Sequence, residues 1–245
     1  MSDSDDPILG SPAQLARLLL PEFERSILEL LVEGFERWKV GGFQRAGDHE
    51  NDFTAVLIGH MLQVRRERDL PFLPQPEQVE FSDEVLAGRA KPNRAPRIDI
   101  AVWWDRLAEG AYFTIECKRL APGDLIAEYV DEGMTRFISQ RYASAVQAAA
   151  MAGYVIHGDP EQLCQQVNLR VTRTVSLGSA HLLGPRSPIA NLATVYESRH
   201  PRSGSTPVIV LTHLFLDVRS RSLLPAKQPD ASAQQANPPR PRRRK

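Results

Sequence analysis

Two stretches of alternating sequence carry the residues best suited to chemistry, which are Asp99, Glu116 and Lys118. Residues 97–104 read Arg-Ile-Asp-Ile-Ala-Val-Trp-Trp, and residues 111–118 read Ala-Tyr-Phe-Thr-Ile-Glu-Cys-Lys. Apolar residues recur at every second position in both stretches, which predicts two strands joined as a hairpin. Neighbouring side chains of a strand point to opposite faces, so Glu116 and Lys118 share one face. The pattern therefore predicts a hairpin with one apolar and one charged face.

The register of this hairpin brings two carboxylates together. The apolar face of the first strand is predicted to hold Ile98, Ile100, Val102 and Trp104. Asp99 then lies on the charged face. If Trp104 and Ala111 close the loop, opposing residues have numbers that add up to 215, and Asp99 faces Glu116. Their Cβ atoms would be about 4.5–5.5 Å apart.

Two facing carboxylates need compensation, because like charges directly opposite one another destabilise a sheet. Mg²⁺ suits this role, since it binds one or two carboxylates and keeps several waters, and Mn²⁺ is an alternative. Such a cation stabilises charge on a phosphoryl group and positions an attacking water. Lys118 could orient or deprotonate that water. Near a cation and partly desolvated, it would have a lowered pKa.

An aspartate followed by Glu-Cys-Lys on the next strand resembles the signature of the PD-(D/E)XK nuclease superfamily, over roughly residues 48–157. The resemblance implies a restriction-endonuclease-like fold with an αβββαβ core. It implies that Asp99 and Glu116 bind Mg²⁺, with the backbone carbonyl of Cys117 as a further ligand, and that Lys118 assists the attacking water. The chain departs from the signature at Ile98, where the family has proline; the nearest proline is Pro96.

The resemblance also implies functional residues on the two flanking helices. Glu50 best matches the acidic residue that many members carry on the helix before the sheet, and Asp52 is the second choice. On the helix after the motif, Arg136, Gln140 and Arg141 are candidates for contacting substrate phosphates. The implied activity is Mg²⁺-dependent hydrolysis of DNA phosphodiester bonds, in restriction, defence or repair.

The surrounding pattern predicts an α/β fold, a mixed sheet flanked by helices. A helical pattern covers residues 12–38, with an expected break at Pro21, and a second helix is expected to start near Asp48, capped by Asp48 or Asn51. Further predicted elements are a strand over 78–85, a basic loop over 88–96, a long helix over 125–151, a strand over 154–157, a helix over 160–167 and a strand over 208–218.

Charge and composition divide the chain into four parts. A polar lead (1–12) and an N-terminal helical extension (13–45) precede the nuclease-like domain (46–224). The chain has 30 basic and 30 acidic residues, but residues 227–245 contain six basic residues and one acidic residue. The tail (225–245) therefore carries +5 and the rest −5, and its Pro- and Gln-rich composition predicts disorder. It could hold nucleic acid by a salt-sensitive attraction.

Composition narrows the remaining choices. No run approaches the roughly 18–20 apolar residues of a membrane span, so we expect a cytoplasmic protein that does not associate with a membrane. Two cysteines are too few for a disulfide framework, and both Cys117 and Cys164 are expected to be buried. His213 lies in an apolar stretch and is expected to be a hydrogen-bonded core histidine.

Several alternatives stay open. The charged hairpin face could be a surface cluster contributing under about 1 kcal/mol. Glu50 could be an ordinary first-turn acid, and the polar residues near Arg136 a solvated helix face. The domain could bind nucleic acid or protein without catalysis, or cleave RNA, since both nucleic acids present the same phosphodiester. The N-terminal helices could serve recognition, packing or formation of a homodimer.

Overall fold

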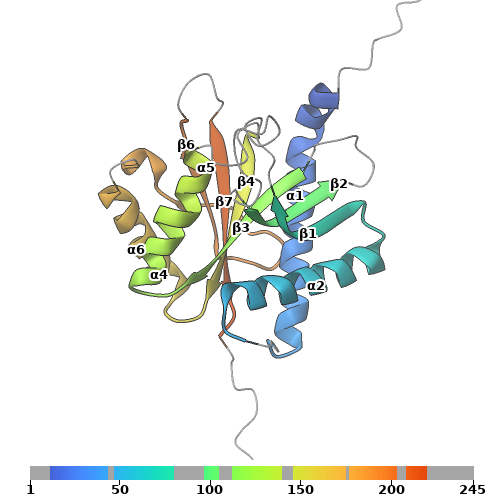
Figure 1. Cartoon of the computed structure of the whole chain (residues 1–245), viewed down its shortest axis with the longest axis horizontal. Coiled ribbons are helices and arrows are strands. Elements are labelled where there is room, and N and C mark those ends of the chain that lie inside the picture. The colour runs from blue at the N-terminus through green and yellow to red at the C-terminus, as the bar shows by residue number, and fades with distance from the viewer. Residues whose placement is uncertain are drawn as a thin grey trace, which may run out of the picture.

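A seven-stranded mixed sheet forms the centre of the protein (Figure 1). The computed structural model describes residues 12–43, 47–79, 97–104, 112–139, 146–174, 177–202 and 208–219. The strands are β1 (Phe72–Val79), β2 (Arg97–Trp104), β3 (Tyr112–Leu120), β4 (Ala148–Val155), β5 (Gly184–Pro185), β6 (Val195–His200) and β7 (Ile209–Asp217). Their spatial order is β1-β2-β3-β4-β7-β6-β5. The central strands β3, β4 and β7 run parallel, and the outer pairs are antiparallel.

Helices cover both faces of the sheet, so the fold is the α/β class predicted from the sequence (Figure 1). One face packs against α1 (Pro12–Val40) and α2 (Glu50–Arg68). The other packs against α4 (Asp124–Ala127), the π-helix η2 (Glu128–Met134), α5 (Thr135–Ile138) and α6 (Pro160–Arg173), with the short 3-10 turn η3 (Ser179–His181) beside them. The described helices include none that is both long and apolar enough to cross a membrane.

Helix α1 runs through Pro21 without a break, so the expected division into two helices is wrong. A proline inside a helix costs about 3 kcal/mol. Further along the same helix, Ile27, Leu28, Leu30 and Leu31 are fully buried in the core shared with the sheet. Burying one such side chain contributes about 1.5–3 kcal/mol, so the packing outweighs the proline. The helix therefore packs as part of the domain.

Helices α1 and α2 approach one another closely at Gly34. A Cβ atom built there would lie 2.8 Å from Cγ and 3.0 Å from the backbone N of Met61. We expect Gly34→Ala to destabilise the protein by about 1–3 kcal/mol, since the backbone of α2 must move. Gly59→Ala, where a Cβ meets nothing within 4 Å, is the matched control and should stabilise by about 0.5–1 kcal/mol. Urea unfolding of both variants tests this; equal effects would contradict the close contact.

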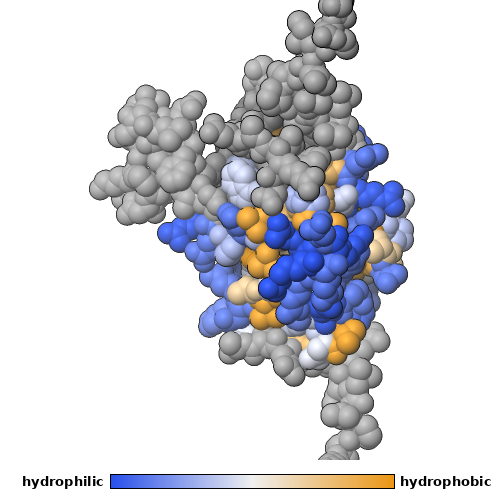
Figure 2. All heavy atoms as spheres, turned by 90° about the vertical axis from the view of Figure 1, so that its right-hand side faces the viewer, coloured by the Kyte–Doolittle hydropathy of each residue, from blue (hydrophilic) through white to orange (hydrophobic). Residues whose placement is uncertain are grey.

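The face of the molecule on the α1–α2 side is mainly hydrophilic. Figure 2 shows this face, the right-hand side of Figure 1, with narrow apolar areas between hydrophilic residues. The last turn of α2 contributes Arg65, Arg66 and Arg68, while Phe53, Leu57 and Met61 point into the core. The helix is thus amphipathic, as its sequence pattern predicts.

Strand β1 begins at Phe72 and contains Pro74 and Pro76, so the expected strand over 78–85 starts six residues too late. Proline lacks the N–H that a central strand needs, but β1 is at the edge of the sheet and, among the strands that the structure describes, pairs with β2 alone. Residues 80–96, including the predicted basic loop, lie outside the described residues, as does the tail from residue 220.

The register of the β2–β3 hairpin is the predicted one. The paired residues are Ile100 and Ile115, Ala101 and Thr114, Val102 and Phe113, and Trp103 and Tyr112, and each pair adds up to 215. One placement is wrong: Ile98 lies in the core cluster on the helix α4–α6 side, while Ile100 and Val102 lie in the other. The ladder with β3 ends at Ile100, and Glu77 on β1, beside Asp99, has φ +46°. The strand is therefore irregular at Asp99.

The long helix expected over 125–151 is also wrong. The helical segment ends at Ile138, and residues 148–155 form β4, which replaces the short strand expected at 154–157. Ala149, Ala150, Met151 and Ala152 are fully buried. A central parallel strand is covered on both faces and reads as a continuous apolar run, so periodicity cannot separate it from a helix. The intrinsic helix preference of alanine is outweighed by sheet pairing on both sides.

The C-terminal third agrees better with the sequence. Helix α6 begins at Pro160 as predicted but extends to Arg173, and β7 lies within the predicted strand over 208–218. Asp159 caps α6, because its side chain accepts hydrogen bonds from the backbone N–H groups of Glu161 and Gln162. Strands β5 and β6 were not predicted. His213 is buried and hydrogen-bonded, and both cysteines are buried, as expected.

Candidate active site

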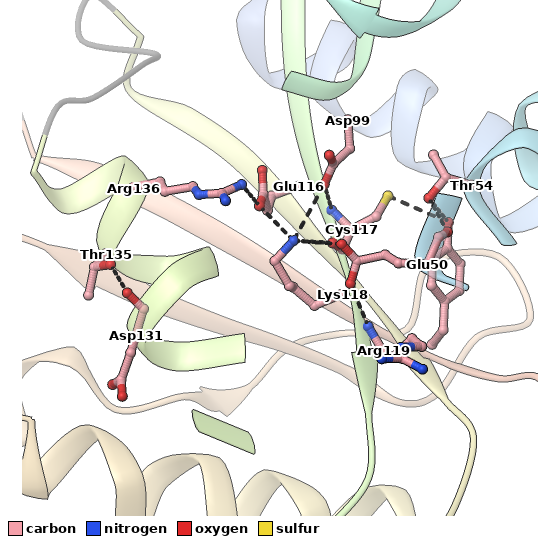
Figure 3. Close-up of polar contacts among 11 residues, drawn as sticks. Glu50, Thr54, Asp99, Glu116, Cys117, Lys118, Arg119, Asp131, Thr135 and Arg136 are labelled. Atoms are coloured by element: carbon pink, nitrogen blue, oxygen red, sulfur yellow. Dashed lines mark hydrogen bonds and ion pairs between the residues drawn. The ribbon is translucent and has the colours of Figure 1, made fainter. Parts of the chain in front are cut away.

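Three carboxylates from three different elements converge on the ammonium group of Lys118 (Figure 3). Lys118 Nζ lies 2.7 Å from Glu50 Oε1, 3.0 Å from Glu116 Oε1 and 3.9 Å from Asp99 Oδ2. It also donates a hydrogen bond of 2.8 Å to the backbone carbonyl of Cys117. The structure thus brings together the four residues predicted as catalytic.

Asp99 is attached to the neighbouring strand through the backbone. The N–H of Cys117 donates to Asp99 Oδ2 at 2.7 Å, just beyond the last regular pair of the β2–β3 ladder. The side chain therefore turns toward Glu116 and Lys118. A hollow of about 300 Å³ opens on the other side of Asp99, lined by Asn51, Thr54, Ala55, Pro76, Glu77 and Asp99. Asp99 joins this hollow to the charged cluster.

Glu50, and not Asp52, reaches the cluster from helix α2. Glu50 stands in the first turn and accepts from Lys118 Nζ and, at 3.0 Å, from the backbone N–H of Arg119. Asp52 instead accepts from the backbone N–H of His49 at 3.0 Å. His49 is the N-cap of α2, so the expected caps Asp48 and Asn51 are wrong. The helix start thereby fixes Glu50 against β3.

The electrostatic balance of the cluster differs from the one expected for Lys118. The side chain is only 7% exposed, and this burial lowers its pKa, but the attraction of Glu116, Asp99 and Glu50 outweighs burial and raises the pKa overall. The expected lowering assumed a neighbouring cation, whereas the neighbours here are carboxylates. Lys118 is therefore a firmly charged ammonium in this structure.

Asp99 has the opposite tendency. Burial and the nearby charge of Glu116 raise its pKa from 3.8 to about 7, although Lys118 and the N–H of Cys117 act against this. A carboxyl with this pKa is strongly perturbed, which is a common property of functional sites. Burial is the larger cause of the raised pKa, and the nearby acid Glu116, which the hairpin register predicts, is the second.

Arg136 reaches the cluster from the opposite helical layer. Its Nη1 lies 2.5 Å from Glu116 Oε1, and the Glu116 side chain is fully buried. Arg136 lies two residues after the end of the π-helix η2, whose Asp131 is paired with Arg170 and Thr174 on the α6 side. Wide π turns often occur at functional sites. Gln140 and Arg141 lie outside the described residues.

Cys117 contributes through its backbone. Its N–H binds Asp99 and its carbonyl oxygen points to Lys118 Nζ, while its thiol is buried and accepts a hydrogen bond of 3.5 Å from Tyr154 Oη. Tyr154 Oη is in turn hydrogen-bonded to Thr54 Oγ1 at 3.1 Å. Burial raises the pKa of the Cys117 thiol well above its ordinary value, so the thiol stays protonated.

Three of these supporting residues were not found by sequence reasoning. Arg119 binds Glu50 through its backbone and Asp48 through its guanidinium, while Thr54 and Tyr154 support Cys117. Arg119 directly follows Lys118 in β3, so its side chain is expected on the opposite face of the strand. The sequence pattern therefore gives no reason to place Arg119 at the site. Thr54 and Tyr154 are 100 residues apart, so only the packing of α2 against β4 joins them.

The donor set fits a hard divalent cation. Asp99, Glu116, Glu50 and the carbonyl of Cys117 offer only oxygen atoms, the ligands that Mg²⁺ and Mn²⁺ prefer. Within the described ranges, no three His, Cys, Asp or Glu side chains form a preassembled metal site. The fit rests on the donor chemistry and on the Lys118 ammonium, a cation that these same oxygens already surround.

Comparison with known proteins gives no relative: no family model, no curated protein and no solved structure matches this chain.

Proposed function

We propose that this protein is a metal-dependent nuclease that hydrolyses phosphodiester bonds of DNA, with Mg²⁺ as the natural cofactor and Mn²⁺ as a substitute. The observation that carries the proposal is the convergence of Asp99, Glu116 and Glu50 on Lys118. The order α2, β1, β2, β3, helical segment, β4 also agrees with the αβββαβ core of the restriction-endonuclease-like fold. Both features are those implied by the resemblance of Asp99 and Glu116-Cys117-Lys118 to the family signature.

The roles follow from chemistry and position. Asp99, Glu116 and the Cys117 carbonyl would hold the cation, with Glu50 completing the set from α2. When bound, Mg²⁺ supplies charge stabilisation for the phosphodiester oxygens and activates the attacking water. Lys118 would orient that water. Arg136, at the rim of the cluster, would contact a phosphate oxygen of the substrate, for which a guanidinium is well shaped.

A metal-dependent cleavage assay tests this proposal. Purified protein is incubated with plasmid DNA, linear DNA and RNA, in Mg²⁺, Mn²⁺ or EDTA. We expect DNA cleavage with either metal and none in EDTA. Glu116→Gln should lower the rate at least about 100-fold, since even residues that only orient metal ligands contribute 10- to 100-fold.

The matched control is Glu161→Gln, the same change at an exposed position on α6, which should cut like the wild type. Cleavage by Glu116→Gln at the wild-type rate would refute the site. Cleavage of RNA alone would keep the site and change the substrate.

A second candidate is a module of the same fold that binds nucleic acid or protein without catalysis. The observation favouring it is that Glu116 already has two cationic partners, Lys118 and Arg136. Such a network is charge-compensated without a metal. Salt-sensitive binding of DNA with no turnover in any metal would support this candidate.

A further inference from the structure

The Lys118 ammonium stands where the acidic groups of the candidate site meet (Figure 3). Its contacts to Glu50, Glu116 and the Cys117 carbonyl are 2.7, 3.0 and 2.8 Å long, and Asp99 lies at 3.9 Å. Among the other cationic groups described at this site, none contacts more than one of these oxygens. Of the three carboxylates, Arg136 contacts Glu116 alone. Lys118 thus contacts Glu50, Glu116 and the Cys117 carbonyl, and lies near Asp99, which are the groups proposed to hold the divalent cation.

A divalent cation and this ammonium would compete for the same oxygens. Mg²⁺ binds its oxygen ligands at about 2.0–2.1 Å, a shorter distance than the 2.7–3.0 Å between Lys118 Nζ and its three nearest oxygens. Two positive charges would then be close neighbours in a site where Glu116 is fully buried and Lys118 is 7% exposed. Little water is available there to screen their repulsion.

We propose that Lys118 is an internal cation that closes the metal site, so that a divalent metal binds only when the Lys118 side chain leaves its carboxylates. This rests on the proposed function, because it concerns the same site. The inference adds that Lys118 and the metal compete for the same carboxylates, which the role of Lys118 in orienting water does not require. The long, flexible lysine stem allows the exchange, since the ammonium can leave while the backbone of β3 stays paired with β4.

The first consequence is that the wild type and two variants should differ in their affinity for Mn²⁺. Lys118→Met keeps the length of the side chain and removes the competing charge, so Mn²⁺ should bind at least about tenfold more tightly than to the wild type. Arg136→Met is the matched control, because it removes one positive charge from the same cluster but contacts Glu116 alone among the cluster carboxylates. Its gain in affinity should be clearly smaller. Titration calorimetry with Mn²⁺ measures all three proteins.

The second consequence is visible in the wild-type protein, and it does not depend on the folding of a variant. Lysine acylation followed by peptide mass spectrometry should label Lys118 slowly without metal and faster in saturating Mn²⁺, because the ammonium has left its carboxylates. Lys39, with a side chain that is 53% exposed, should be labelled equally in both conditions.

The outcomes separate this inference from the proposed function. Tighter binding to Lys118→Met than to Arg136→Met, with faster labelling of Lys118, supports the inference even if no nucleic acid is cut. Equal or weaker binding to Lys118→Met, or labelling that does not change at saturating Mn²⁺, overturns it even if the wild type cleaves DNA. Failure of all three proteins to bind Mn²⁺ overturns both.

Discussion

Replacing Asp99 by asparagine is expected to abolish metal-dependent cleavage and, in the same protein without metal, to raise its stability at pH 8. The loss of activity should be at least about 100-fold, because the amide is a much weaker ligand for Mg²⁺ than the carboxylate. Asp124→Asn, on the exposed first turn of α4, is the matched control and should keep its activity.

The gain in stability follows from the pKa of Asp99. Burial and Glu116 raise this pKa from 3.8 to about 7, so the folded protein holds a proton that the unfolded chain releases earlier. Without metal, the wild type therefore loses stability as the pH rises from about 4 to about 7. Asparagine avoids this loss and should gain up to about 4 kcal/mol at pH 8, but little at pH 4. Urea unfolding in EDTA at both pH values measures the difference; an equal effect at both would contradict it.

The second large effect is expected at acid pH, from a buried chain of hydrogen bonds away from the candidate site. The chain links His181 Nδ1 to His200 Nδ1 at 2.6 Å, His200 Nε2 to Ser198 Oγ at 2.6 Å, Ser198 Oγ to His213 Nε2 at 2.7 Å, and His213 Nδ1 to Tyr129 Oη at 2.8 Å. His200 and His213 are fully buried. A proton added to either one would place an uncompensated charge in the core.

Burial, with the neighbouring His181, lowers the pKa of His200 from 6.5 to about 3. Burial, with His200, lowers the pKa of His213 well below its ordinary value. The unfolded chain therefore takes up these protons first, and stability is lost as the pH falls below 6.5. His200 contributes about 1.4 kcal/mol per pH unit. At pH 5 its protonation in the unfolded chain costs about 2 kcal/mol, a sizeable part of the 5–15 kcal/mol that stabilises a typical domain, and His213 acts in the same direction.

The variant His200→Gln isolates this effect, because glutamine can donate and accept hydrogen bonds but takes up no proton. We expect it to reduce the loss of stability between pH 6.5 and 5 by about 2 kcal/mol relative to the wild type. Asp99 titrates identically in both proteins, so its opposite contribution cancels in the difference. His157→Gln, at an exposed position, is the control and should follow the wild type. Parallel pH curves for His200→Gln and the wild type would contradict this account.

Much of the candidate site was predictable because Asp99, Glu116 and Lys118 lie on one hairpin. Alternation determines the face of each side chain, and a slip of one residue would place the charged side chains of one strand opposite the apolar side chains of the other. The register that pairs Ile100 with Ile115 follows from this, and with it the closeness of Asp99 and Glu116. The resemblance favoured Glu50 over Asp52, and the first turn of α2 shows how Glu50 reaches Lys118.

Other elements could not be predicted, because their local signals were ambiguous or misleading. The alanine-rich run at 148–152 favours a helix, yet it forms the centre of the sheet, where small side chains pack on both faces. Pro74 and Pro76 precede the strand predicted over 78–85, because proline is unfavourable in a central strand, yet they are tolerated in the edge strand β1. Pro21 stays inside α1, since the buried face of that helix outweighs its cost.

The sequence by itself determined the α/β class, the hairpin and its register, because alternation separates apolar from charged side chains and a slip of one residue would mix them. Only the tertiary structure decided what surrounds the carboxylates. It placed the start of α2 beside β3, so that Glu50 binds Lys118 and Arg119, and it placed α5 so that Arg136 reaches Glu116. These contacts join residues 20 to 69 positions apart. No local pattern records such distances, because they depend on how the helices pack across the sheet.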